Sequence, residues 1–459
     1  MNYIPVTCEQ REAMLRAVGV RNVSELFADV PHAARLTEPL ALPDGMPEMG
    51  LVAHMEGLAR ANAPAVELVS FMGAGCYDHY IPAVVDHMTR KPEFFTAYTP
   101  YQPEISQGTL QAMWEYQSMI CALTGATVSN ASMYDGATAM VEAALMAARV
   151  TKRHRIVVSA GIHPEWRQTL DTYAEAGTLD VDIVPLGAGG STDSDSLVAA
   201  LEAGDVAAVI VASPGFLGVL EDIRNISQSA SRGGALLVVA TDPLLLGVLE
   251  PPARQGADII VAEGQSLGGA MSLGGPGLGI FACDQKHVRQ MPGRLVGRTV
   301  DVDGNTGFVL TLSTREQHIR REKATSNICS NHALNALAAG AYLAAMGGKG
   351  LAETAASCVA KAHYMHDALL DTGVFARIFD APFGYEFALE YRGDVATMQE
   401  AMLEGGFLAG VSVGRMLWNS SAGIEGLDRE RLERAVVFAV TEKRTRDEID
   451  AFVGEVVGL

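Results

Sequence analysis

The sequence predicts an α/β protein built on a mostly parallel sheet, with helices on both faces. Six short apolar runs bounded by Gly, Asp or Pro lie between residues 155 and 284, and helix-like stretches separate most of them. This alternation is typical of βαβ units, which build parallel sheets. Almost half of the 459 residues are hydrophobic and 19% are charged, which indicates a globular protein of two or three domains.

Composition excludes several classes of protein. The net charge of −20 and the lack of any Lys/Arg cluster argue against a nucleic-acid-binding protein. The six cysteines lie far apart, without a CxxC motif or a Cys/His pair at metal-ligand spacing, so we expect neither a zinc site nor a disulfide framework. No run is long enough for a membrane span, and the N-terminus does not resemble a signal peptide. These features predict a cytoplasmic protein.

Three regions follow from the pattern along the chain. Residues 1–65 form an N-terminal segment of short helices, with a capping box of Thr7 and Gln10 and a second helix start at Asn22. Such a segment cannot close its own core, so we expect it to pack on another surface. Residues 66–330 form a large α/β domain. Residues 331–459 form a small α+β domain that begins with an alanine-rich helical stretch interrupted by glycines at 347–350.

A loop dense in Tyr, Pro and Gln precedes one long helix. Apolar residues spaced for a half-buried helix follow the loop, with Ser106 predicted as the cap and Gly125 as the end. Prolines stiffen the loop. Its polar side chains are those of Tyr98, Tyr101, Gln102, Glu104 and Gln107. Two interpretations stay open at this stage, a functional polar surface or an ordinary loop whose tyrosines cap a core.

The ends of the predicted strands are the expected place for a ligand. The candidates there are His163, Ser213 with Pro214, Asp242, and the turn at residues 263–266. An aspartate and a histidine at strand ends suit a pyridoxal phosphate enzyme, which also needs a lysine that binds the cofactor covalently.

That lysine is missing from the predicted sheet region. No lysine occurs between Lys152 and Lys286. Asp242 is followed at once by a proline and an apolar run, which favours a turn aspartate over a cofactor partner. The helix predicted at residues 137–150 opens on a polar turn, which suits either an anion site or a plain cap by Asp135 or Ser132.

Several motifs carry a family resemblance over nearly the whole chain. They are YTPYQPEISQG, GQSL with GGPGLG, MPGRLVG, and TREQHIRREKATSNIC. They resemble the amino-terminal half of the glycine decarboxylase P-protein, and the length is similar to that of subunit 1 of its two-subunit bacterial form. The resemblance implies a fold-type I, aminotransferase-like fold with a seven-stranded sheet in the large domain. It implies decarboxylation of glycine with pyridoxal phosphate and transfer of the aminomethyl group to the lipoyl arm of H-protein.

The resemblance also implies a division of labour between subunits. In that family the cofactor lysine lies in subunit 2, and counting back from residues 274–277 places Gln265 at the lysine position. The chain is therefore expected to lack covalently bound pyridoxal phosphate and to complete the partner's site in an α2β2 assembly. Tyr98, Tyr101 and Glu104 are the residues we expect to reach towards that site, with Gln102 and Gln107 beside them.

The segment at residues 314–329 holds Arg315, Arg320 and Arg321 among glutamates. The favoured interpretation is a solvated helix face with internal ion pairs. The alternative, more specific interpretation is that this segment is an interface for an acidic lipoyl carrier, and Arg294 and Arg298 would be part of that interface.

Two functions of other classes stay open from the sequence. The chain would be a pyridoxal phosphate enzyme without a lysine if His163 replaced that lysine. It would be a structural or regulatory scaffold if the equivalent of the cofactor site were filled by side chains such as Leu244 and Leu267.

Overall fold

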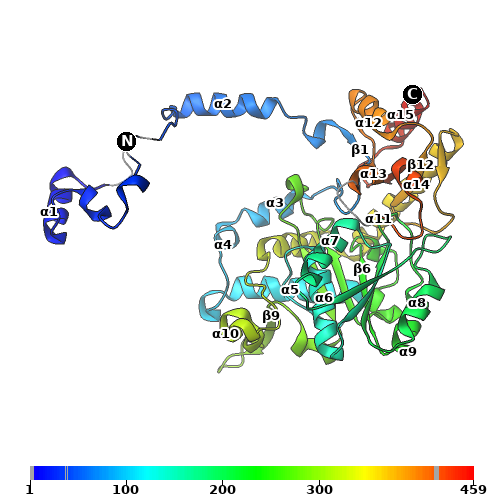
Figure 1. The fold of residues 1–459 in the computed structure, drawn as a ribbon, viewed down its shortest axis with the longest axis horizontal. Coiled ribbons are helices and arrows are strands. Elements are labelled where there is room, and N and C mark those ends of the chain that lie inside the picture. The colour runs from blue at the N-terminus through cyan, green and yellow to red at the C-terminus, as the bar shows by residue number, and fades with distance from the viewer. Residues whose placement is uncertain (1–4, 37, 39, 418–422, 459) are drawn as a thin grey trace. The chain divides into compact units, whose positions relative to one another are not determined.

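The computed structural model describes residues 5–36, 38, 40–417 and 423–458 (Figure 1). The chain forms two compact units, residues 1–63 and 64–459. The predicted boundary between a large and a small domain after residue 330 lies inside the second unit and stays a prediction. None of the described helices combines the length and the hydropathy that a membrane span requires.

The N-terminal unit consists of short helices without a core. It contains α1 (Cys8–Val18) and α2 (Glu48–Arg60), and none of its described residues is buried. The predicted capping box is confirmed, because the Thr7 hydroxyl accepts a hydrogen bond from the Gln10 amide at 3.2 Å. Asn22 likewise caps a short 3-10 turn, as predicted. Exposed apolar side chains of this unit include Met14, Val18, Leu26, Phe27, Leu40, Leu42, Met46, Met49, Leu51, Met55 and Leu58.

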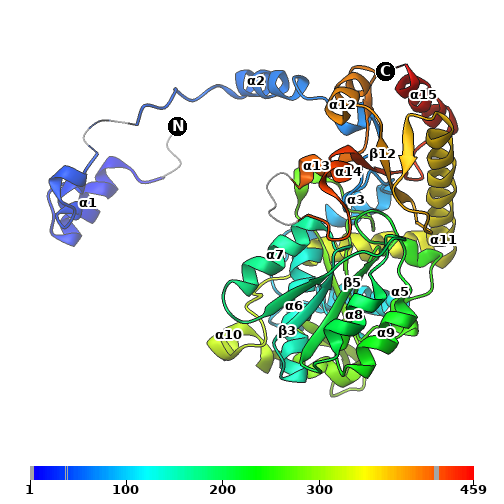
Figure 2. The same ribbon diagram turned by 45° about the vertical axis from the view of Figure 1, so that its right-hand side comes forward.

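The second unit is built on a seven-stranded sheet with the order β2-β8-β7-β6-β5-β3-β4 (Figure 2). The six predicted strands are confirmed as β3 (Arg155–Ser159), β4 (Asp180–Val184), β5 (Val206–Ser213), β6 (Leu236–Thr241), β7 (Ile259–Glu263) and β8 (Gly279–Cys283). Strands β3 to β7 pair in parallel, whereas β8 is antiparallel to β7 and to the short β2 (Val128–Ser129). The predicted α/β class is therefore confirmed.

Helices cover both faces of this sheet. The helices α6 (Gly136–Thr151) and α7 (Pro164–Ala174) pack on one face, and α8 (Ser194–Leu201) and α9 (Ile223–Arg232) pack on the other. Because successive side chains of a strand point to opposite faces, Ile210 joins the first core, and Val209 and Val211 join the second. Every residue of β5 is buried, as expected for a central parallel strand.

The long helix α5 (Gln107–Thr124) begins and ends where predicted, but Ser106 does not cap it. Ser106 has ψ of 23°, outside the extended conformation in which a cap side chain reaches the first free amides, and its hydroxyl makes no capping bond. Gly125 ends the helix in the left-handed conformation, with φ of 74°. Helices α3 (Ala83–Thr89) and α4 (Pro92–Phe95) precede α5, which packs on the hairpin of β9 (Leu295–Val300) and β10 (Thr306–Thr311).

The C-terminal part begins with α11 (Ala333–Asp371), which is interrupted at Gly347, as predicted. A four-stranded antiparallel sheet follows, in the order β11-β12-β15-β14. Its strands are β11 (Phe375–Arg377), β12 (Glu386–Tyr391), β14 (Val411–Ser412) and β15 (Ala435–Ala439). The accompanying helices are α12 (Val395–Glu404), α13 (Val413–Met416), α14 (Arg429–Arg434) and α15 (Arg446–Val457). The chain returns to an earlier segment where β13 (Phe407–Leu408) pairs with β1 (Val69–Ser70).

Candidate functional site

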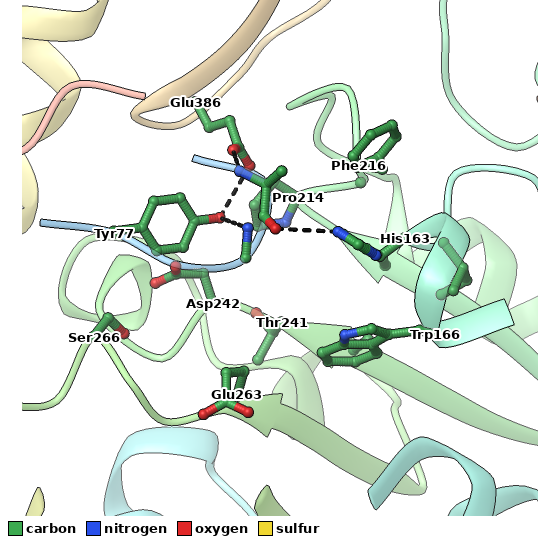
Figure 3. A pocket seen from close by; sticks show the side chains of 16 residues that line it. Tyr77, His163, Trp166, Pro214, Phe216, Thr241, Asp242, Glu263, Ser266 and Glu386 are labelled. Carbon is green, nitrogen blue, oxygen red and sulfur yellow. Dashed lines mark hydrogen bonds between the residues drawn. The ribbon is translucent and has the colours of Figure 1, made fainter. Parts of the chain in front are cut away.

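A cavity of about 80 Å³ lies at the carboxyl ends of the central strands (Figure 3). Its lining comes from the segments after β3, β5, β6 and β7, from residues 74–77, and from the start of β12. The labelled side chains are Tyr77, His163, Trp166, Pro214, Phe216, Thr241, Asp242, Glu263, Ser266 and Glu386. The cavity thus occupies the place where a ligand was predicted from strand topology.

His163 is held in a neutral state at the edge of this cavity. Its Nε2 lies 3.1 Å from the Ala74 carbonyl oxygen, and its ring meets the edge of Phe216 with centroids 5.0 Å apart. Burial lowers the pKa of the imidazole below its ordinary value. The bond to a carbonyl requires Nε2 to carry the proton, so this histidine is fixed by the chain itself.

Asp242 is a buried turn aspartate, as the sequence favoured. One carboxylate oxygen accepts hydrogen bonds from the amides of Leu244 and Leu245, at 2.8 and 3.1 Å, and the other accepts one from the Tyr385 hydroxyl. Burial raises the pKa of this carboxyl, and the Tyr385 bond opposes the rise. The carboxylate is therefore engaged by protein donors.

Gln265 stands at the end of β7, where the resemblance placed the missing lysine. Its Oε1 accepts a hydrogen bond from the Tyr77 amide at 2.9 Å. Its Nε2 donates to the carbonyls of Tyr77 and Gly269, at 2.9 and 2.8 Å. Both ends of the side-chain amide therefore bind backbone and join two loops.

A carboxylate occupies the N-terminus of α6, which is the place where a phosphate would bind in such a fold. Glu263 accepts hydrogen bonds from the amides of Gly136, Leu278 and Gln265, at 3.0, 2.8 and 3.1 Å. A Cβ at Gly136 would lie 2.3 Å from the Trp166 ring, so the helix start is closely packed. Burial raises the pKa of Glu263, and the amide donors oppose the rise.

The polar turn before α6 also has no free donor at the predicted cap. The Asp135 side chain accepts from the Thr138 amide at 2.7 Å, and the two residues form a capping box. Of the two interpretations of this turn, the plain cap by Asp135 is confirmed and the anion site is wrong. Ser132 is buried and accepts from the His332 amide instead.

Pyridoxal phosphate does not fit these residues. The chain offers no lysine here, Glu263 and Trp166 fill the phosphate position, and Asp242 is bound to protein donors. The cavity is also small beside the roughly 300 Å³ or more of typical ligand pockets. Leu244 and Leu267 are fully buried and do not line this cavity, whereas Leu267 lines a neighbouring cavity with Gln265.

The loop before α5 exposes most of its predicted site residues. Tyr98 is 78% exposed and Tyr101 is 47% exposed, and the side chains of Gln102 and Glu104 are exposed as well. Tyr98 also lines a small groove beside Phe95. The alternative that both tyrosines cap a core is therefore wrong.

Gln107 differs from the other loop residues. Its Nε2 donates to the carbonyls of Pro103 and Phe308, and its Oε1 accepts from the Phe308 amide at 2.8 Å. The amide is thus used within this chain, where it holds the loop against β10. Gln107 is exposed, and the prediction that it faces a partner stays a prediction.

The arginine-rich segment does not form one internally paired helix. It consists of two 3-10 turns around the single helical turn α10 (Gln317–Arg320). Arg315 is buried and donates to the backbone carbonyls of Met291 and Gly293, so it does not belong to an exposed patch. Arg320 and Arg321 are exposed. The favoured interpretation of this segment is therefore wrong, because tertiary packing takes Arg315 inside.

Arg294 joins the loop to the arginine-rich segment. Its guanidinium donates to the Tyr101 hydroxyl at 3.2 Å and lies 5.5 Å from the centre of that ring. It also lies 3.5 Å from the Glu316 carboxylate, and both of these charged side chains are buried. His318 packs edge-on against Tyr101, with ring centroids 5.4 Å apart. Residues some two hundred positions apart thus form one surface.

Trp166 and Glu386 are among the lining residues of the cavity that were not found from the sequence. Trp166 lies on α7, and Glu386 lies at the start of β12 in the other sheet. No local motif marks either residue. Both residues reach the cavity only through the tertiary fold, which brings α7 and β12 to the same place.

The fold is that of fold-type I pyridoxal-phosphate-dependent enzymes. A sphingosine-1-phosphate lyase of Burkholderia pseudomallei K96243 matches with a TM-score of 0.65 and 17% identity over 93% of both chains. A glutamate decarboxylase of Lactobacillus brevis matches with a TM-score of 0.67 and 14% identity over 95% of this chain and 96% of that chain. These distant likenesses show the fold alone.

Closer similarities define the family. The model of the glycine cleavage system P-protein family matches residues 1–454. A crystal structure of glycine decarboxylase (P-protein) of the glycine cleavage system, in inhibitor-bound form, matches with a TM-score of 0.88 and 42% identity over all of both chains. Proteins described as probable glycine dehydrogenase (decarboxylating) subunit 1 are 49% identical in Moorella thermoacetica and 48% identical in Chlorobaculum tepidum, both over full length. The chain belongs to the glycine cleavage system P-protein family.

Proposed function

We propose that this chain is subunit 1 of a two-subunit glycine dehydrogenase (decarboxylating, aminomethyl-transferring). In this proposal subunit 2 binds pyridoxal phosphate, two copies of each subunit form an α2β2 assembly, and lipoylated H-protein accepts the aminomethyl group. The observation that carries the proposal is Gln265, whose amide binds only backbone at the position of the missing lysine. All six cysteines are free, which fits the cytoplasm as the compartment.

The chain's own contribution is to complete the partner's site. Bound pyridoxal phosphate supplies the electron sink for loss of carbon dioxide from glycine. The opposite wall has to orient the substrate carboxylate and exclude water. The exposed loop residues Tyr98, Tyr101 and Glu104 offer two hydroxyls and one carboxylate for this wall. Arg294 fixes the direction of the Tyr101 hydroxyl, because it donates to that oxygen.

The remaining exposed groups fit contacts with the other proteins. The N-terminal unit has no core of its own and presents apolar side chains such as those of Leu51, Met55 and Leu58, which suit a protein contact. We assign this surface to subunit 2. The exposed cations Arg320 and Arg321 follow His318, whose ring packs on Tyr101, and they suit an acidic lipoyl carrier.

The test compares this chain alone, subunit 2 alone and the two mixed, each with pyridoxal phosphate, glycine, H-protein and labelled bicarbonate. Exchange of label into glycine is expected only in the mixture. Replacing Tyr98 or Tyr101 by Phe, or Glu104 by Gln, is expected to slow exchange roughly tenfold to a thousandfold without preventing assembly. Tyr80, which is 62% exposed outside the loop, gives the matched control Tyr80→Phe.

The outcome also separates the alternatives. Exchange by this chain alone, with cofactor absorbance that survives gel filtration, would support the alternative that this chain is a pyridoxal phosphate enzyme without a lysine. Full activity of subunit 2 alone would indicate that this chain is a structural or regulatory scaffold. Unchanged exchange in all three loop variants would remove the loop from the site while leaving the subunit assignment intact.

A further inference from the structure

The cavity at the strand ends is acidic and aromatic, and no described lysine or arginine lines it. Its carboxylates and aromatic rings are those of Asp242, Glu263, Glu386, Tyr77, Trp166 and Phe216. They surround one space in Figure 3, with Glu386 and Glu263 on opposite sides and Trp166 along the wall. An anionic ligand would be repelled there, whereas a cation would meet both carboxylates and ring faces.

One buried hydroxyl of the lining has no partner. Ser266 is 2% exposed, and its Oγ makes no hydrogen bond with any described part of the chain. Its side chain lies near Asp242 in the same cavity (Figure 3). Buried hydroxyls are nearly always paired, so an unpaired one that lines a cavity indicates a missing donor or acceptor.

Of the three carboxyl groups, Glu386 is the one whose ionised form a bound cation would stabilise most. Its oxygens accept hydrogen bonds from the Ala74 amide and from the Tyr77 hydroxyl, the latter at 3.0 Å. Burial raises the pKa of this carboxyl to about 7, and these two donors only partly oppose the rise. The pKa values of Asp242 and Glu263 are raised too, with burial as the largest cause. Three carboxyl groups thus share a space that no described lysine or arginine lines, and the one basic side chain there is the His163 imidazole.

We propose that this cavity binds a small primary amine as its ammonium ion. The space of about 80 Å³ admits a group of a few heavy atoms, and an ammonium brings three N–H donors to a lining that offers the acceptor oxygens of Glu386, Asp242 and Ser266. The aromatic walls stabilise the cation further. Glycine itself fits poorly, because its carboxylate would lie among carboxylates. The site therefore selects an amine that carries no acid group.

A metal ion fits the cavity less well. Within the described residues, the one group of three metal-ligating side chains close enough to share an ion is His79, Cys358 and Glu442, which do not line this cavity. In that group the Glu442 carboxylate already pairs with the His79 ring at 2.7 Å. The carboxylates of Asp242, Glu263 and Glu386 do not form such a group, so within the described residues they lack the spacing for one shared metal ion.

The experiment titrates the full-length chain with methylamine hydrochloride and follows tryptophan fluorescence. Trp166 lines the cavity and is one of three tryptophans, so Trp166→Phe is expected to abolish the change. Glu386→Gln and Ser266→Ala are each expected to weaken binding about tenfold. Ser266→Ala removes an oxygen without partners and should leave the fold intact. Glu400→Gln, at an exposed site on α12, should bind like the parent chain.

Calorimetry provides a second readout. The titratable groups facing the ligand are Tyr77, His163, Asp242, Glu263 and Glu386. Near pH 7 an ammonium ion would displace a proton from Glu386, so the measured heat should vary with the ionisation enthalpy of the buffer. Absence of saturation, equal or tighter binding of glycine or acetate, or unchanged affinity in Ser266→Ala would each overturn the proposal.

Discussion

Replacing Glu263 by alanine is expected to destabilise the second unit strongly, although Glu263 contacts no other ionic side chain at salt-bridge distance in the described structure. The carboxylate accepts three backbone amides, those of Gly136, Gln265 and Leu278. Alanine leaves all three donors without an acceptor, at the start of α6 and beside the end of β7. The loss should therefore exceed that of an ordinary surface glutamate, which is close to zero.

The size of the effect follows from these three bonds. A hydrogen bond to a charged group contributes about 1.5 to 3 kcal/mol, and the cost of burying the carboxylate and the entry of water offset part of the sum. We expect a net loss of about 3 kcal/mol. With an unfolding slope of about 3 kcal/mol per molar urea, the urea midpoint should fall by about 1 M.

The matched variant Glu263→Gln tests the reasoning more sharply. It keeps one acceptor oxygen, which can serve the amides of Gln265 and Leu278 but not that of Gly136. Its loss should be about 1 kcal/mol, between those of the parent chain and Glu263→Ala. Urea unfolding followed by circular dichroism measures both variants, with Glu400→Ala as an exposed control. Equal midpoints for the alanine variant and the parent chain would refute the assignment of Glu263 as the anion of this helix start.

Three further results are expected. The pKa of Glu386 is raised from the ordinary 4.5 to about 7 in the folded chain, so its stabilising effect is complete below about pH 4.5 and about 3 kcal/mol is lost as the pH rises through 7. The urea midpoint should therefore change less between about pH 5 and about pH 8 in Glu386→Gln than in the parent chain. An equal change in both chains would contradict this prediction. Gln265→Lys should retain no pyridoxal phosphate after gel filtration and should lose about 1 to 3 kcal/mol, because the Tyr77 amide loses its acceptor; stoichiometric labelling by borohydride reduction would contradict it. Replacing Leu51, Met55 and Leu58 by Ala, on one face of α2, should change the free energy of unfolding of the isolated chain by no more than about 0.5 kcal/mol. The same change should weaken binding to subunit 2 by tenfold or more in light scattering, whereas unchanged binding would exclude this face from the interface.

The strands were the most predictable part of the fold. Runs such as residues 207–213 are apolar, short and bounded by turn residues, so their burial in a parallel sheet follows from composition. The antiparallel direction of β8 depends on a turn whose geometry no local pattern specifies. Ser106 shows the same limit on a smaller scale, because the residue type suits a cap but the backbone angles do not.

The candidate site was predicted in part. The missing lysine is visible in the sequence because it depends on residue identity alone, and the Gln265 position follows from the family resemblance. The contacts of Glu263 with α6, and of Glu386 with Tyr77, join segments more than a hundred residues apart, and no periodicity encodes them. Arg315 was misjudged for the opposite reason, since its charged neighbours suggest solvent while its guanidinium is buried on carbonyls.

Because Glu263 supplies the negative charge at the start of α6, the folding of this subunit does not depend on bound pyridoxal phosphate. In a fold whose helix start depends on a bound phosphate, the empty protein loses the stabilisation that the ligand provides by mass action. Here the negative charge is part of the chain, joined to the amides of Gly136, Gln265 and Leu278. Cells starved of pyridoxine should therefore keep this chain folded and abundant.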